Sequence, residues 1–196
     1  MDKFASNCER PVDVLFVGGY SRHHQRRAET LEIVAALQKD LNIVFHLDRS
    51  RLNRLAESTF GRLLPLRNHR RPLPIQAVSV NPVFGLDLYA AISTAKIVLN
   101  GAVDMAGNDR GNMRCFEAMG CGALMISDAG NYPAGMVDGK TMLAYEDAAH
   151  AARLIRQSIS ETDRREEIAK KGWQLMAHEY TKANQWQNFQ QLVAGL

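Results

Sequence analysis

A segment in the second half of the chain combines glycines, asparagines and charged side chains in an order that suits ligand binding. Residues 100–128 are NGAVDMAGNDRGNMRCFEAMGCGALMISD, with Asn100 at the end of an apolar run and a glycine-rich loop reaching Gly111. Asn112 then stands where a helix is expected to begin, and asparagine is favoured at that N-cap position. The backbone amides of Gly111 and Asn112 are therefore expected to point at whatever occupies the adjacent cleft.

Glu117 lies about one turn into this expected helix. A carboxylate in that position can accept two hydrogen bonds from a vicinal diol such as a ribose. Arg114 stands three residues earlier, at a spacing that also permits a simple ion pair on one helix face. The spacing alone leaves both roles open.

A second candidate loop, Gly18-Gly19-Tyr20-Ser21-Arg22, follows the first apolar run. Glycine lets backbone amides approach a phosphate closely, and the start of a helix adds a favourable dipole. Arginine forks match phosphate oxygens, so the cluster Arg22, His23, His24, Arg26 and Arg27 predicts phosphate contact, with an exposed charged helix start as the alternative. The loop is not GxGxxG, which disfavours a dinucleotide oxidoreductase. The two histidines lack further well-spaced ligands, so no metal site is expected.

The elements that must position these loops follow from hydrophobic periodicity. Largely apolar runs predict buried strands at residues 12–19, 42–47, 96–100 and 123–127, with one short strand at 75–80 inside a proline-rich loop. Helical spacing predicts helices over residues 30–37, 52–64, 86–95, 112–120, 148–159, 163–179 and 182–192, with Pro65 ending the second of them. Apolar strands alternating with helices indicate a parallel sheet covered on both faces. The fold class is therefore α/β, one doubly wound domain over residues 1–196, with ligands at the carboxyl ends of its strands.

Composition sets further bounds. The chain has 196 residues, of which 46% are hydrophobic and 23% charged, as in an ordinary globular protein. Its net charge is +3, but residues 22–71 carry eleven Lys and Arg against five acids. That excess favours an anionic partner or solvated helix faces, and the scarcity of interleaved aromatic residues disfavours nucleic acid.

The remaining composition points to the cytoplasm. Three scattered cysteines indicate neither a disulfide framework nor a zinc site. We expect no membrane span, because no apolar run approaches about 18 residues, and no signal peptide, because the N-terminus is polar. Five methionines, at positions 105, 113, 119, 125 and 136, are expected to fill the core.

The run Arg110–Asp128 resembles the donor-binding signature of GT-B glycosyltransferases. In many retaining members a Glu is followed, after seven residues, by a second Glu and then by A-M-x-C-G and a strand ending in Ser-Asp. Glu117 matches the second Glu, and Asp109 replaces the first with a shorter acid. The fuller pattern of Asn112, Arg114, Phe116 and Glu117 more closely resembles the CgeB-like glycosyltransferases.

The resemblance implies a nucleotide-sugar as donor substrate and a role for each matching residue. Glu117 would bind the ribose hydroxyls, Gly111 and Asn112 would cradle the diphosphate or the sugar, and Asp109 would contact the donor sugar. Arg22 and Arg26 would neutralise the diphosphate leaving group, which GT-B enzymes do with protein groups instead of a bound metal. The full expected donor-binding set is Gly19, Arg22, Arg26, Asn100, Asp109, Gly111, Asn112, Arg114 and Glu117. No residue is identified as a catalytic base, and the stereochemistry of transfer stays open.

A complete GT-B enzyme has two Rossmann-like halves, and this chain resembles the C-terminal donor-binding half. Its first strand lies so near the N-terminus that we expect no other domain before it, and the chain is then a fragment, a stand-alone donor module or one chain of a split enzyme. Within the last helices, residues 163–196, Trp186, Phe189 and Val193 share one face. That face either packs on the domain's own sheet or meets the missing half or a partner protein. The alternative function is a non-catalytic binding or interaction module that kept the fold and lost transfer.

Overall fold

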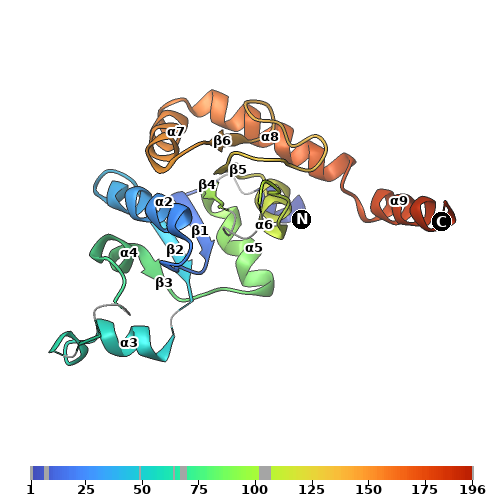
Figure 1. The fold of residues 1–196 in the computed structure, drawn as a ribbon. Helices are drawn as coiled ribbons and strands as arrows, with labels where there is room; N and C mark the ends of the chain where they lie inside the picture. Colours follow the sequence, from blue (N-terminus) through green and yellow to red (C-terminus); the bar gives the residue numbers. More distant parts are fainter. Residues whose placement is uncertain are drawn as a thin grey trace.

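A single parallel sheet forms the centre of the computed structural model (Figure 1), which describes residues 2–6, 9–48, 50–63, 65–66, 70–101 and 107–195. Its strand order is β3-β2-β1-β4-β5-β6, and every neighbouring pair is parallel. The strands are β1 (Val12–Gly18), β2 (Ile43–Leu47), β3 (Ser79–Val80), β4 (Ala95–Leu99), β5 (Leu124–Asp128) and β6 (Leu143–Tyr145). The order reverses between β1 and β4, which is the topological switch point of a doubly wound fold. The predicted fold class is confirmed.

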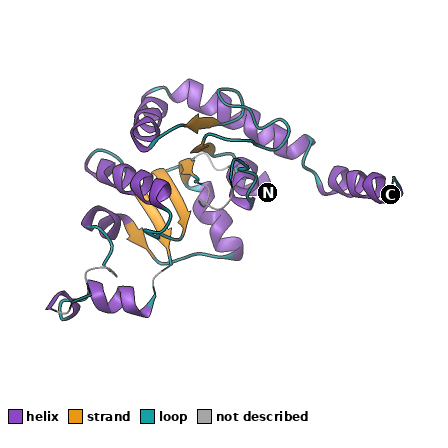
Figure 2. Cartoon of the chain, viewed as in Figure 1, coloured by secondary structure: helices purple, strands orange, loops and turns teal. Residues whose placement is uncertain are grey.

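Helices cover both faces of this sheet (Figure 2). They are α1 (Asp2–Ala5), α2 (Gln25–Ala35), α3 (Arg51–Glu57), α4 (Leu73–Val78), α5 (Gly85–Ser93), α6 (Met113–Gly120), α7 (Ala148–Ser160), α8 (Thr162–His178) and α9 (Lys182–Ala194). Short 3-10 turns lie at η1 (Ala36–Lys39) and η2 (Gly61–Leu63). Helices α2, α4 and α7 pack on one face, α5 and α6 pack on the other, and α8 contributes to both apolar clusters.

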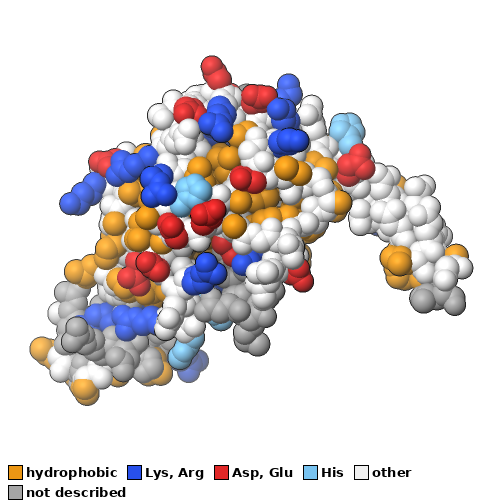
Figure 3. Space-filling view, turned by 45° about the horizontal axis from the view of Figure 1, so that its top comes forward, with side chains coloured by type: hydrophobic (Ala, Val, Ile, Leu, Met, Phe, Trp, Pro, Cys, Tyr) orange, Lys and Arg blue, Asp and Glu red, His pale blue; other side chains and the backbone are white. Residues whose placement is uncertain are grey.

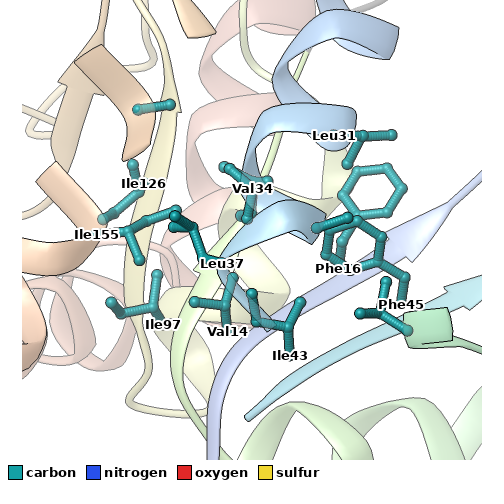
Figure 4. Packing of buried hydrophobic residues seen from close by; sticks show 14 of the residues in the cluster. Val14, Phe16, Leu31, Val34, Leu37, Ile43, Phe45, Ile97, Ile126 and Ile155 are labelled. Carbon is teal, nitrogen blue, oxygen red and sulfur yellow. The ribbon is translucent and has the colours of Figure 1, made fainter. Parts of the chain in front are cut away.

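The core consists of the apolar strand residues and the helix faces turned toward them. Figure 4 shows Val14 and Ile97 of the sheet gathered against Val34 of α2 and Ile155 of α7. All four side chains are completely buried. Burying one such side chain stabilises the fold by about 1.5–3 kcal/mol. This packing fixes where β1 and β4 end, and therefore where their loops can meet.

The predicted strand at residues 75–80 is wrong for most of its length. Residues 73–78 form α4, and only Ser79–Val80 pair with β2. The proline-rich sequence explains the difference, because Pro72 and Pro74 stand at the start of the helix. Proline is accepted in a first helical turn, where its missing N–H would have had no partner.

The helix predicted over residues 52–64 ends early, at Glu57. Ser58 adopts an extended conformation, its hydroxyl donates to the carbonyl of Leu55 at 2.7 Å, and it accepts from the amide of Gly61 at 3.0 Å. A Cβ atom at Gly61 would lie 1.7 Å from the Leu55 carbonyl oxygen, so the chain folds back on the helix there. Local side-chain bonding of Ser58, and not Pro65, therefore ends this helix.

Helix α9 stands away from the rest of the molecule in Figure 1, with apolar side chains on this arm in Figure 3. It has no buried residue. Trp186 and Phe189 are 59% and 54% exposed and stack on each other with ring centroids 5.7 Å apart. The alternative in which this face packs on the domain's own sheet is therefore wrong.

The methionine prediction fails at one position. Met119, Met125 and Met136 are buried as expected, but Met113 is 74% exposed at the start of α6. Met105 lies outside the described residues. In the described ranges, no helix combines the length and apolarity that a membrane crossing requires.

Candidate functional site

A cavity of about 530 Å³ opens at the carboxyl edge of the sheet, at the switch point between β1 and β4. The end of β1, the loop after β4 and the first turn of α6 form its walls. Six of the nine predicted site residues line it: Asn100, Asp109, Gly111, Asn112, Arg114 and Glu117. The cavity therefore lies where parallel α/β sheets bind their ligands.

A second cavity, of about 540 Å³, adjoins the first. The two share Arg27, Gly101 and Arg110 as lining residues. The second cavity extends between the start of α2 and the loops that follow β5 and β6, and it includes the predicted residue Arg26. Together they form one cleft along the carboxyl edge, with charged side chains in both parts. We call it the donor cleft, after the role predicted for its residues from the sequence.

Asn100 forms hydrogen bonds with several of the elements that surround the donor cleft. Its side-chain amide donates to Ser127 Oγ of β5 at 3.1 Å, and its Oδ1 accepts from Asn112 Nδ2 at 3.3 Å. The hydroxyl of Tyr145 in β6 donates to the backbone carbonyl of Asn100 at 3.0 Å. Asn112 occupies the N-cap position of α6, but its side chain bonds Asn100 instead of a helix amide. One buried asparagine therefore fixes α6 against the sheet.

Glu117 is only 8% exposed and lies in the wall of the donor cleft. Its Oε2 is 2.6 Å from Nη1 of Arg114, so the ion pair that the spacing allowed is formed. That contact uses one carboxylate oxygen, and a carboxylate has two. The ion pair and a hydroxyl-binding role are therefore compatible.

Arg110 was not singled out from the sequence, although it stands inside the motif. It is 7% exposed, and its Nε lies 2.5 Å from Oδ2 of Asp128 at the end of β5. Its Nη1 donates to the carbonyl of Gly107 at 2.6 Å. A Cβ atom at Gly130 would lie 2.6 Å from Cγ of Arg110, so only glycine allows this close approach. In the sequence, Arg110 stands beside Asp109 and Asp128 ends a predicted strand, but no spacing rule predicts that these two residues pair.

Asp109 sits in a braced turn at the rim of the donor cleft. It is exposed, and it pairs with Asn131 in an isolated parallel bridge. The amide of Arg110 donates to the carbonyl of Asn131 at 2.9 Å, and the amide of Asn131 donates to the carbonyl of Asn108 at 2.7 Å. The backbone on both sides of Asp109 is thus fixed while its carboxylate faces solvent.

The arginines of the first loop separate in space. Arg22 donates to the carbonyl of Arg70 at 2.8 Å and lines a different, smaller pocket of about 200 Å³. Arg27 instead lines both parts of the donor cleft, donates to the carbonyl of Gly19, and lies over the ring of Phe16 at 5.9 Å. The cluster therefore supplies Arg26 and Arg27 to the cleft, and it does not bring Arg22 there.

One thiol and two phenol groups beside the cleft stay neutral at neutral pH. Burial raises the pKa of the Cys115 thiol to about 11. Burial also raises the pKa values of Tyr132 and Tyr145, whose hydroxyls donate to the carbonyls of Asp128 and Asn100. These groups are hydrogen-bond donors that shape the site, since neither a thiolate nor a phenolate forms at neutral pH. Among the described residues, no three His, Cys, Asp or Glu side chains are grouped to hold a metal ion.

A doubly wound parallel sheet with a cleft at its switch point is typical of a Rossmann-like domain. Residues 53–191 match the family model described as glycosyl transferase-like. The match spans well over half of the chain, and the protein therefore belongs to this glycosyl transferase-like family. A search of curated proteins found none that matches the chain significantly.

Solved glycosyltransferase structures share the fold. The C-terminal domain of LpcC, a group 1 family glycosyl transferase from Francisella tularensis, has a TM-score of 0.59 and 16% identity over 86% of each chain. Anabaena HepE, in complex with UDP and glucose, has a TM-score of 0.65 and 16% identity over 95% of this chain. Sucrose-phosphate synthase from Thermosynechococcus elongatus has a TM-score of 0.60 and 19% identity over 95% of this chain.

These identities are low, so the similarity establishes the fold alone. That fold is the Rossmann-like half domain of GT-B glycosyltransferases. The chain spans 49% of the HepE chain and 46% of the sucrose-phosphate synthase chain, about half of each.

Proposed function

We propose that this chain is the donor-binding half of a glycosyltransferase and binds a nucleotide-diphosphate sugar in the donor cleft. The observation that carries the proposal is the convergence of Glu117, Asn112 and Arg27 on one cavity at the switch point of the sheet. Crystals of the structural neighbour HepE contain UDP, which favours a uridine nucleotide among the candidates.

In this proposal Glu117 accepts hydrogen bonds from the ribose hydroxyls, and Arg114 holds its carboxylate in place through the 2.6 Å contact. The backbone at Gly111 and Asn112 cradles the diphosphate or the sugar beside the first turn of α6, where the helix dipole favours anions. Asp109 contacts the donor sugar from the braced turn at the rim.

Arg26 and Arg27 neutralise the charge that grows on the diphosphate as the glycosyl bond breaks. Fixed cations at such a position lower the barrier because they meet charge that develops in the transition state. Arg27 takes the role that the sequence suggested for Arg22, because it lines the cleft. We propose that no metal is needed for donor binding. UDP affinity should then be unchanged by EDTA, and a large loss of affinity would refute this part of the proposal.

Transfer requires an acceptor held in line with the donor carbon. We propose that a second GT-B half or a partner chain supplies the acceptor site, since the chain spans about half of HepE. The chain alone should therefore bind UDP-glucose without glycosylating an added acceptor, and turnover by the chain alone would contradict this. The CgeB-like subtype is also a proposal, which rests on Asn112, Arg114, Phe116 and Glu117. It predicts that Arg114→Lys weakens UDP binding.

We further propose a cytoplasmic location, because the buried free thiols of Cys115 and Cys121 suit a reducing compartment. Recovery of the native protein in a membrane or secreted fraction after cell fractionation would argue against it.

The test of the donor site is calorimetric titration with UDP, GDP, ADP and their glucose conjugates. One nucleotide should bind far more tightly than the others. Glu117→Ala should weaken that binding about 5- to 150-fold, which corresponds to the loss of about 1–3 kcal/mol when hydrogen-bonded polar groups lose a partner. Glu161→Ala, an acid at the end of α7 outside the donor cleft, is the matched control and should leave affinity unchanged.

Urea unfolding of each variant separates binding from folding. If Glu117→Ala lowers stability but leaves nucleotide affinity unchanged, the ion pair with Arg114 is the whole role of Glu117. If no nucleotide binds the wild-type chain, the fold is a non-catalytic relative of the transferases, or its donor site is completed by the missing half. Adding that half should then restore binding only in the second case.

A further inference from the structure

We propose that the opposite edge of the sheet carries a second binding site, for a small organic anion that contains a planar aromatic group. The cavity there has a volume of about 670 Å³. Binding sites for small molecules in proteins range from about 300 to 1,000 Å³, so the space is adequate. We call it the basal cavity.

The basal cavity is separate from the donor cleft. Arg10 precedes β1, Lys96 is the second residue of β4 and Gly122 precedes β5, so the cavity lies where these strands begin. The donor cleft lies where β1 and β4 end. Five residues of β4 separate the two edges by roughly 16 Å, at about 3.3 Å per residue. Among the described residues, none lines both the basal cavity and the donor cleft.

The lining of the basal cavity is strongly basic. Arg10, Lys96, Arg165 and Lys170 contribute cations, and Glu166 is the acid among the described lining residues. The surplus of three positive charges equals the net charge of the entire chain, +3. Lys96 also contacts Asp13 at 2.7 Å, which reduces the local surplus to two. Such a concentration of one sign favours an anionic ligand.

The two arginines are held in place mainly by backbone carbonyls, which carry no net charge. Arg10 donates to the carbonyls of Ala95 and Cys121, both at 2.8 Å. Arg165 is 8% exposed and donates to the carbonyl of Ser158 at 3.1 Å, with Glu166 at 3.4 Å as a weak, exposed counter-ion. Burial lowers the pKa of Arg10, because the charged guanidinium loses hydration. A bound anion would offset the free-energy cost of that lost hydration.

One wall of the basal cavity is aromatic. Trp173 is partly buried on α8, and Ala169 lies one turn before it on the same wall. An indole face favours planar rings over other apolar groups. On the side of β5, Gly122 has a φ of +71°, and a Cβ atom there would lie 3.2 Å from Nη2 of Arg10. Glycine therefore leaves that guanidinium open to the cavity. Cations beside one aromatic wall fit an aromatic carboxylate or phosphate.

The test uses the tryptophan in the wall as its reporter. The chain has two tryptophans, so in the variant Trp186→Phe the emission comes from Trp173. Titration of this variant with phenyl phosphate should change the emission saturably, whereas phenol and inorganic phosphate should bind at least tenfold more weakly. Adding Lys170→Gln should weaken phenyl phosphate binding at least fivefold, because it removes a cation from the rim.

Lys171→Gln is the matched control. It removes the same charge from the next residue of α8, where the ammonium pairs with Glu167 at 2.6 Å outside the cavity. An equal loss of phenyl phosphate affinity in both variants would mean that general surface charge causes the effect, and it would overturn the proposal. So would the absence of a saturable response, or equally tight binding of phenol. Saturating UDP should not displace phenyl phosphate, and displacement would assign the probe to the donor cleft instead.

Discussion

Helices α6 and α9 have similar patterns of apolar and polar residues, but α6 is packed within the domain and α9 is exposed. Both carry apolar residues at helical spacing beside polar ones, but α6 buries five of its residues and α9 buries none. Helix α6 packs against both β5 and α8, and a Cβ atom at Gly172 of α8 would lie 3.2 Å from Cε of Met119. In α9, Trp186 and Phe189 stack on each other and remain more than half exposed.

The contrast shows what an amphipathic pattern leaves undetermined. It identifies the face that needs a partner, but it does not say whether the same chain provides one. For α6 the partner is in the chain, and the burial also fixes Glu117 and the first turn that lines the donor cleft. For α9 the described residues provide none.

The largest expected effect is on the buried face of α6. Met119→Ala should lower the free energy of unfolding by about 2–5 kcal/mol, because it removes a fully buried side chain and leaves a cavity between α6 and α8. Urea unfolding monitored by circular dichroism measures the change. Met113→Ala on the same helix is the control, since Met113 is 74% exposed and should give a change within about 0.5 kcal/mol. Equal effects would mean that α6 is not packed as described.

The next effect concerns the attachment of α6 to the sheet. Asn100→Ala should cost about 1–3 kcal/mol, because Asn112 and Ser127 lose a buried partner. The same unfolding experiment applies, with Asn108→Ala as an exposed control in the neighbouring turn. A loss no greater than that of the control would show that the Asn100 network does not hold the helix.

The burial of α6 also predicts an alkaline instability. Burial raises the pKa values of Cys115 and Cys121 from 9.0 to about 11. Well below pH 9 the thiols are protonated in both the folded and the unfolded chain, so their ionisation does not reduce the stability. Between pH 9 and 11 the unfolded chain releases these protons and the folded chain keeps them, so stability falls as pH rises.

Urea midpoints at intervals from pH 8 to pH 10 test this expectation. That window lies at or below the ordinary tyrosine pKa of 10.0, so the thiols contribute more to the decline than Tyr132 and Tyr145 do. Cys115→Ala should flatten the decline. Rapid alkylation of Cys115 and Cys121 in the native protein at pH 9 would show that their thiols are not protected, and the prediction would be wrong.

Much of the fold was predictable because its strands are apolar on both faces. The largely apolar runs at residues 12–19 and 96–100 indicated buried parallel strands, and the structure places these strands at Val12–Gly18 and Ala95–Leu99. The failures were local. Three-residue β6 is too short for any periodicity, and the segment at 73–78 carries strand-like residues whose helical state depends on two prolines at its start.

The candidate site was predictable where its residues are close in sequence. Asp109, Gly111, Asn112, Arg114 and Glu117 belong to one segment and line one cavity. Contacts between residues of different segments were harder to predict, because no spacing rule relates Arg110 to Asp128 or distinguishes Arg27 from Arg22. The two arginines are five positions apart: Arg27 lies in the first turn of α2 and lines the donor cleft, whereas Arg22 lies in the turn before α2 and contacts Arg70.

The smallest expected effect completes the comparison. Phe189→Ala in α9 should change the free energy of unfolding of the isolated chain by no more than about 0.5 kcal/mol, because the side chain is already 54% exposed. Phe45→Ala in β2, where the ring is fully buried, should cost about 3–5 kcal/mol in the same experiment. If Phe189→Ala proves nearly as costly, α9 is covered in solution, and sedimentation equilibrium would then show whether a second copy of the chain covers it.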